Sequence, residues 1–94
     1  MTPDRPFPLS GVDVGRTVVV REVRSGSPDV DGDAIGLRLR ELGFVEGEPL
    51  RVVAHGYPGR EPIAVRIGNT TFALRRFEAD HVLVGPAHDV ETRK

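Results

Sequence analysis

The sequence LRELGFVEG, residues 39–47, contains the signals of a helix that ends and turns at once into a β-strand. Glycine has no Cβ, so it tolerates the left-handed backbone conformation that commonly follows the last turn of a helix. Gly43 therefore predicts the end of a helix, and Gly47 predicts the next turn. We call residues 39–47 the helix–strand joint, because a helix is expected before this segment and a β-strand after it.

The segment before Gly43 has the apolar spacing of a short amphipathic helix. The apolar residues that recur at i, i+4 and i+7 are Ile35, Leu39 and Leu42. A helix is predicted at about residues 34–42, and Asp33 or Asp31 is the predicted N-cap, because a carboxylate accepts hydrogen bonds from free N–H groups at a helix start. Residues 29–33 alternate small and acidic side chains, which indicates a flexible loop.

Runs of β-branched and alternating apolar residues predict five short strands. These strands cover residues 17–23, 50–55, 63–67, 70–74 and 81–84. Gly68-Asn69 is typical of a two-residue hairpin turn, with Phe72 and Leu74 facing inward on the returning strand. Pro58-Gly59 indicates a tight turn, and residues 75–80 a single helical turn.

An open sheet of five short strands would leave two exposed edges and too little apolar surface to stabilise them. We therefore predict a mainly β fold: a small SH3-like, five-stranded, partly open barrel with one α-helix inserted between strands 1 and 2. Residues 1–86 form this single domain, and residues 87–94 are a polar C-terminal tail.

Composition limits the classes of function. The net charge of −1 argues against nucleic-acid binding, which relies on clustered Lys and Arg. The chain has no cysteine, which excludes disulfides and thiolate metal sites. No run approaches the roughly 20 apolar residues of a membrane span, so direct membrane insertion is not expected. Asp4 and three prolines occupy residues 1–9, where a signal peptide needs an apolar run, so we expect a cytoplasmic protein.

The order and spacing of several short motifs resemble the FeoA family. The matching motifs lie within residues 37–84 and are LGF at 42–44, YPGREPI at 57–63, FALR at 72–75 and ADHVLV at 79–84. The chain departs from the family pattern at Glu46, where proline is common, and in its longer acidic loop. A similar module also forms the C-terminal domain of some metal-dependent repressors.

The resemblance implies an SH3-like fold and an accessory or regulatory role in bacterial ferrous iron uptake, without catalysis and with no required cofactor. It implies a partner, the membrane transporter FeoB, through the cytosolic part that carries its GTPase domain. The protein would then be peripheral to the inner membrane through this partner. Short barrel edges also predict a homodimer.

Candidate contact residues for such a partner are of the types that dominate interfaces, aromatic residues and arginine. They are Phe44, Tyr57, Arg60 and Arg75. We expect the helix, the Phe44-Val45 segment and the loop at residues 57–62 to converge at one end of the barrel. Tyr57 and Arg60 are the preferred contacts, because Phe44 has an alternative role in the core.

The alternative function is a divalent-metal sensor or a GTPase regulator. Imidazole and carboxylate suit zinc or ferrous iron, and the candidate ligands are His81, His55 and Glu78, with His88 also considered. Adjacent residues of a strand face opposite ways, so Asp80 and His81 do not easily hold one ion.

Arg60 in an exposed turn is the candidate arginine finger of the regulator alternative, whereas Arg75 and Arg76 follow the hairpin. For Arg75 an ion pair with Glu78, three residues on, is the alternative interpretation. No Ser/His/Asp set, phosphate-binding glycine loop or His-x-x-x-His pair occurs, so we do not predict an enzyme.

Overall fold

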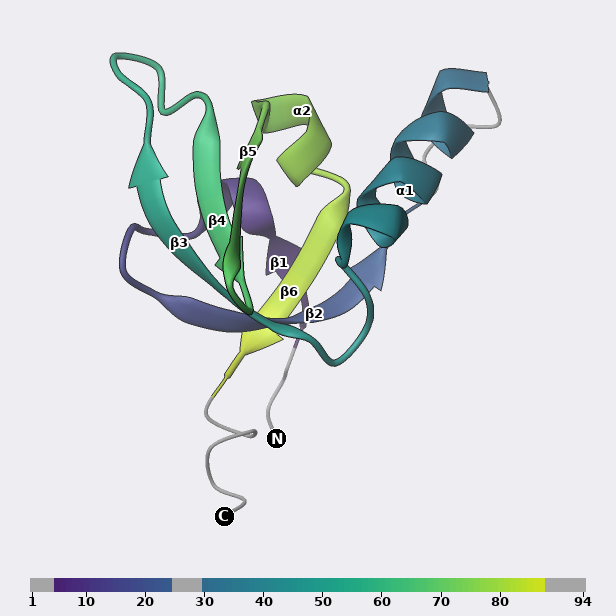
Figure 1. Cartoon of the computed structure of the whole chain (residues 1–94), viewed down its shortest axis with the longest axis horizontal. Helices are drawn as coiled ribbons and strands as arrows, with labels where there is room; N and C mark the ends of the chain where they lie inside the picture. The colour runs from purple at the N-terminus through teal and green to yellow at the C-terminus, as the bar shows by residue number, and fades with distance from the viewer. Residues whose placement is uncertain (1–4, 25–29, 88–94) are drawn as a thin grey trace.

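The computed structural model describes residues 5–24 and 30–87 (Figure 1). Its elements follow in chain order. They are β1 (Phe7–Pro8), the 3-10 turn η1 (Leu9–Gly11), β2 (Thr17–Val23), α1 (Val30–Leu42), β3 (Pro49–His55), β4 (Ile63–Ile67), β5 (Thr70–Leu74), α2 (Arg76–Ala79) and β6 (Val82–Pro86).

The strands form one antiparallel sheet in the order β1-β6-β2-β3-β4-β5. The sheet curves around a core but does not close, so β1 and β5 are its two edges (Figure 1). The predicted mainly β, partly open barrel is confirmed. The prediction of five strands was one short, because Phe7 and Pro8 pair with Val84 and Leu83. Pro8 is tolerated there because an edge strand needs hydrogen bonds on one side only.

Three strand predictions, at residues 17–23, 63–67 and 70–74, agree with the structure at both ends. The helix begins at Val30, not Ala34, so Asp31 and Asp33 lie inside it and neither is its N-cap. The predicted loop at 29–33 was therefore wrong for residues 30–33, and residue 29 lies outside the described residues.

The last strand also differs at both of its ends. The backbone N–H of His81 donates to the carbonyl of Glu78 over 3.0 Å, so His81 lies in the turn after α2, and β6 starts at Val82. Gly85 and Pro86, which lie beyond the predicted end of this strand at residue 84, are part of it. Ala87 is buried, and the rest of the predicted tail, residues 88–94, lies outside the described residues.

The core is built from the inward faces of the strands and one face of α1. Its largest fully buried side chains are Phe44, Leu9, Leu39, Leu50, Ile63 and Leu74, with several valines of β2, β3, β4 and β6. Phe72 is half-buried and Leu74 is buried, as predicted for the inward face of β5. The rings of Phe44 and Phe72 lie 5.7 Å apart between centroids.

The helix–strand joint has the predicted geometry. Gly43 has a φ of +115°, in the left-handed region. The N–H of Phe44 donates to the carbonyl of Leu39 over 3.0 Å, which ends α1 with a hydrogen bond that reaches back over the last turn. Gly47, at φ +89°, then donates its N–H to Val20 of β2 over 2.8 Å. The C-terminal end of the joint is thus hydrogen-bonded to β2 of the sheet.

The loop between β3 and β4, residues 56–62, closes at its base through one tight backbone contact. The N–H of Gly56 donates to the carbonyl of Pro62 over 2.8 Å. A Cβ on residue 56 would overlap the carbonyl group of Glu61, so only glycine fits without moving the backbone.

We therefore expect Gly56→Ala to destabilise the protein by about 2 kcal/mol or more, which lowers the melting temperature by roughly 10 °C. The matched control is Gly59→Ala in the same loop, because a Cβ at residue 59 would meet nothing within 4 Å. Thermal and urea unfolding measure both variants. Equal stability of the two variants would contradict this account of the loop.

Candidate functional site

The β3–β4 loop is held in place by contacts at both of its flanks. The carboxylate of Glu61 accepts a hydrogen bond from the backbone N–H of Arg76, at the start of α2, over 2.8 Å. Arg60 lies 3.8 Å from the carboxylate of Asp13, in the segment between η1 and β2. The Glu61 contact and the bond at Gly56 hold the base of the loop, and the exposed Arg60–Asp13 pair adds a weak third contact.

Exposed side chains lie on this loop and on the segment before β2, and the two segments meet at the Arg60–Asp13 pair. Tyr57 is 94% exposed, the largest exposed fraction among the large apolar side chains of the described residues, and Val14 is 51% exposed. Arg60 is exposed, with its backbone at a φ of +65°. We call Asp13, Val14, Tyr57 and Arg60 the loop surface. An exposed aromatic ring beside an arginine has the composition of a protein-binding surface.

Phe44 is not part of this surface. Its side chain is fully buried, so the alternative role in the core is correct and the prediction that it contacts a partner was wrong. Figure 1 also shows α1 at the right of the molecule and the β3–β4 loop at the upper left. The predicted convergence of helix and loop at one end of the barrel was therefore wrong.

Arg75 lies apart from the exposed tip of the loop. Its exposed side chain lines a depression of about 310 Å³ together with Glu61, Pro62 and Ala73. Its backbone N–H donates to the Glu78 carboxylate over 2.9 Å. The expected link between Arg75 and Glu78 therefore exists, but through the backbone of Arg75.

Glu78 is buried, and its carboxylate links the start of α2 to α1. Glu78 is 8% exposed, and besides the Arg75 N–H it accepts a hydrogen bond from the Arg38 guanidinium of α1 over 2.7 Å. A carboxylate in the first turn of α2 satisfies a free N–H and complements the helix dipole. Both carboxylate oxygens have partners, so Glu78 has a structural role.

The three predicted metal ligands do not form a metal centre by themselves. His81 uses Nδ1 in a 2.8 Å hydrogen bond with the carbonyl of Phe77, and His55 lies at the end of β3 with its Nε2 buried and without a hydrogen-bond partner. Within residues 5–24 and 30–87, no group of three His, Asp or Glu side chains is placed to hold a metal ion. The donors present therefore do not fit a resident zinc or iron site.

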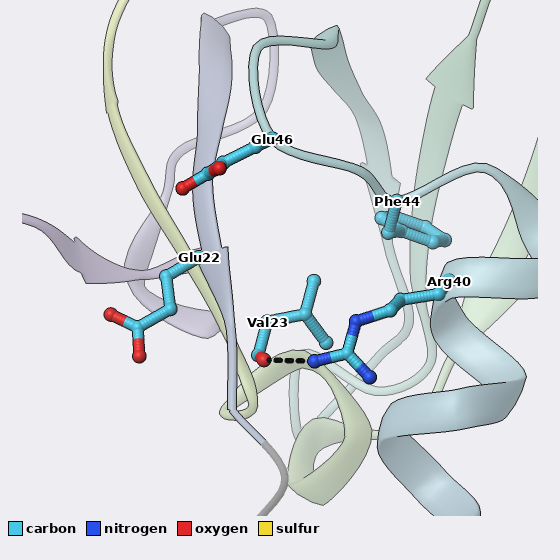
Figure 2. Close-up of a pocket in the computed structure, with 5 residues that line it drawn as sticks. All are labelled: Glu22, Val23, Arg40, Phe44 and Glu46. Carbon is cyan, nitrogen blue, oxygen red and sulfur yellow. Dashed lines mark hydrogen bonds between the residues drawn. The ribbon is translucent and has the colours of Figure 1, made fainter.

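A second depression, missed by the sequence analysis, lies between the joint and the end of β2 (Figure 2). It has a volume of about 240 Å³ and is lined by Glu22, Val23, Arg40, Phe44 and Glu46. The Arg40 guanidinium donates to the Val23 carbonyl over 2.9 Å, while the carboxylates of Glu22 and Glu46 point away from it (Figure 2). The one feature of the sequence that could have indicated this depression was Arg40, a basic residue in the last turn of α1. Arg40 here fastens the end of α1 to β2.

The described residues thus define a class of protein: a small, mainly β domain with one open antiparallel sheet and an exposed aromatic residue on the β3–β4 loop. No helix in the described part of the chain is long and apolar enough to cross a membrane. The chain belongs to the FeoA family, since the model of the FeoA domain matches residues 7–86. This family is associated with ferrous iron transport and comprises small accessory proteins, not enzymes.

Solved structures of the family share the SH3-like fold. FeoA of Stenotrophomonas maltophilia, described as a prokaryotic SH3-domain protein and complexed with zinc, is 46% identical, with a TM-score of 0.73 over 83% of this chain and 88% of that one. FeoA of Chlorobium tepidum is 30% identical, with a TM-score of 0.69 over 85% of this chain and 70% of that one. No curated protein matches the sequence.

The fold extends to a second kind of protein. A manganese-dependent transcriptional repressor, 20% identical, has a TM-score of 0.74 over 92% of this chain and 44% of its own. At this identity the likeness concerns the fold alone. It agrees with the expectation that a similar module occurs in metal-dependent repressors.

If Glu78 has a structural role, Glu78→Ala will cost about 1–2 kcal/mol of stability, because the Arg75 N–H loses its partner at the start of α2. Arg38→Ala will cost less than about 1 kcal/mol, since the Arg38 side chain is 61% exposed and water replaces its contact. Urea unfolding separates the two effects. If Arg38→Ala loses more stability than Glu78→Ala, the main contribution of Glu78 is the ion pair and not the hydrogen bond at the start of α2.

Proposed function

We propose that this protein is a cytoplasmic accessory protein of ferrous iron uptake that binds the cytosolic part of a FeoB-type GTPase transporter through the loop surface. Membership of the FeoA family supports the link to ferrous iron transport. The Stenotrophomonas relative has been put forward as a bacterial ferrous iron transport activating factor, which supports a regulatory role. Such a protein reaches the inner membrane through its partner.

The observation that carries the proposal is the exposure of Tyr57 on a loop held from both sides. A tyrosine side chain buries roughly 150–250 Å² when it enters a pocket, and it loses little conformational entropy because it has only two rotatable angles. The backbone groups of Gly56 and Arg76 already hold the base of the loop, so binding has less of the loop to order. Both features favour Tyr57 as an anchor.

Arg60 supplies the second contact. Within the described residues it forms one ion pair, with Asp13, at 3.8 Å between two exposed side chains. Such a pair contributes little and exchanges readily for a partner's carboxylate. The partner surface that fits therefore has an apolar pocket for Tyr57 beside an acidic residue for Arg60. An acidic contact also makes the association rate sensitive to salt.

We expect the double variant Tyr57→Ala, Arg60→Gly to bind the cytosolic part of the transporter at least about 30-fold more weakly, as expected for loss of an aromatic anchor and its neighbouring charge. Glycine at residue 60 keeps the positive φ of +65° and removes only the side chain. Calorimetry or biolayer interferometry with the purified cytosolic part measures the affinity, and thermal unfolding checks the fold.

The matched control is Phe77→Ala, which removes an aromatic ring that is 51% exposed on α2, outside the loop surface. We expect this control to bind like the wild type. If the double variant folds normally and keeps its affinity, the loop surface is not the contact.

The exposure of Arg60 also favours a second candidate, in which the loop inserts this arginine into the GTPase site of the partner. An arginine finger raises the hydrolysis rate by about 10³–10⁵-fold. Arg60→Lys separates the two functions, because lysine keeps the charge for docking but lacks the planar guanidinium. Stimulated GTP hydrolysis that is lost in Arg60→Lys, with binding retained, would establish the finger; unchanged hydrolysis would exclude it.

Metal sensing has weaker support. The zinc of the Stenotrophomonas structure favours it, while the positions of His55, Glu78 and His81 do not. Calorimetric titration with zinc and with ferrous iron, on the wild type and on His81→Ala, measures whether this chain binds either ion.

A further inference from the structure

We propose that the edge strand β5 pairs with β5 of a second copy of this chain, in an antiparallel two-fold arrangement centred on Phe72. This inference is independent of the proposed function. Its starting point is the sheet order, in which β5 is the last strand and has only β4 as a neighbour. All five residues of β5 pair with β4 in continuous register, from Thr70 opposite Ile67 to Leu74 opposite Ile63, without a bulge.

The hairpin geometry determines which peptide groups of β5 face outward. Across a two-residue turn the flanking pair, here Ile67 and Thr70, exchanges both hydrogen bonds, and bonded and non-bonded pairs then alternate along the strand. The N–H and C=O groups of Thr70, Phe72 and Leu74 therefore point to β4, and those of Thr71 and Ala73 point to the open side. No other backbone group in the described part of the chain forms a hydrogen bond with these outward groups.

The edge also lacks the features that usually prevent strand pairing. Protected edges carry charges, proline or bulges. The strand Thr70–Leu74 reads TTFAL and has none of them. Thr71 and Ala73 are exposed, and Ala73 borders the open depression beside Arg75, so no described segment covers the edge there.

A second copy of β5 fits this edge because the strand is self-complementary about Phe72. With Phe72 opposite Phe72 of the second copy, Thr71 lies opposite Ala73 and Ala73 opposite Thr71. Both of these pairs are hydrogen-bonded, which satisfies all four outward groups of each strand. The central Phe72 pair is then a non-hydrogen-bonded pair, the type with the closest side chains, and aromatic pairs at such positions are favourable.

The charges near the edge permit this register. The same register, continued one residue beyond Leu74, places Arg75 opposite Asn69 of the second copy. No two like charges are therefore directly opposed. The contact surface is small, one strand of five residues on each side, so we expect a weak, concentration-dependent dimer and not an obligate one.

The test uses the whole chain. Sedimentation or light scattering across a concentration series will show the wild type rising from the mass of one chain toward that of two. Ala73→Pro removes one outward N–H and adds no charge, and proline is tolerated where a strand edge faces solvent. We expect this variant to stay at the mass of one chain at all concentrations, with thermal unfolding unchanged within a few degrees.

Cysteine cross-linking tests the register even if the proline variant does not fold, because the chain has no native cysteine. A mixture of Thr71→Cys and Ala73→Cys proteins should form disulfide-linked dimers several-fold faster than either protein alone, since residues 71 and 73 are opposed across the two-fold axis and identical positions are further apart. Arg51→Cys, exposed on the internal strand β3, is the control that should not cross-link.

Three results would overturn the proposal. They are a wild type that stays at the mass of one chain up to about 1 mM, an Ala73→Pro protein that dimerises like the wild type, and cross-linking that is equal for all cysteine variants. If the wild type does not dimerise but Ala73→Pro loses affinity for the transporter, the edge receives a strand of the partner and not a second copy.

Discussion

The burial of Phe44 is the interaction on which the rest of the structure depends. The residue follows a glycine in the left-handed conformation, so the chain reverses direction within one residue and directs the ring into the core. Phe44 packs there near Phe72 of β5, while the next turn bonds to Val20 of β2. The Phe44 side chain therefore connects the end of α1 to the edge strand β5, and the turn that follows it connects the same end to β2.

The local elements could be predicted because their signals are local. β-branched runs, the Gly68-Asn69 turn and Gly43 fix strands, hairpin and helix end through the conformations of a few neighbouring residues. The missing strand β1 could not be found in this way, because it exists only through pairing with β6, more than seventy residues later, and through the Arg16 side chain that covers the Phe7 ring. The helix start was misplaced because small and acidic residues favour caps and loops in isolation, and this weak local preference does not determine where a helix begins.

The candidate site residues also divide into those with local signals and those whose environment comes from distant parts of the chain. The exposure of Tyr57 and Arg60 could be predicted because a Pro-Gly turn between two strands projects from the sheet. Glu78 and Phe44 were misassigned because chemistry alone does not distinguish a carboxylate that binds metal from one that caps a helix, or a ring in an interface from one in the core. Only burial separates these alternatives. The depression at Arg40 was missed because its walls come from β2, α1 and the joint, which are distant in sequence.

The open sheet raises the question of what closes the barrel. The chain leaves the edge strand β5, passes through α2 and returns to β6, which lies on the far side of three strands. Buried Ala79 and the hydrogen bond from Ser10 to Asp80 join α2 to the turn η1, and Glu78 joins it to α1. Side chains of α2 thus cover the gap that a pair of edge strands would otherwise close. Because this closure uses none of the outward peptide groups of β5, the described part of the chain covers its core and still leaves the backbone edge of β5 unpaired.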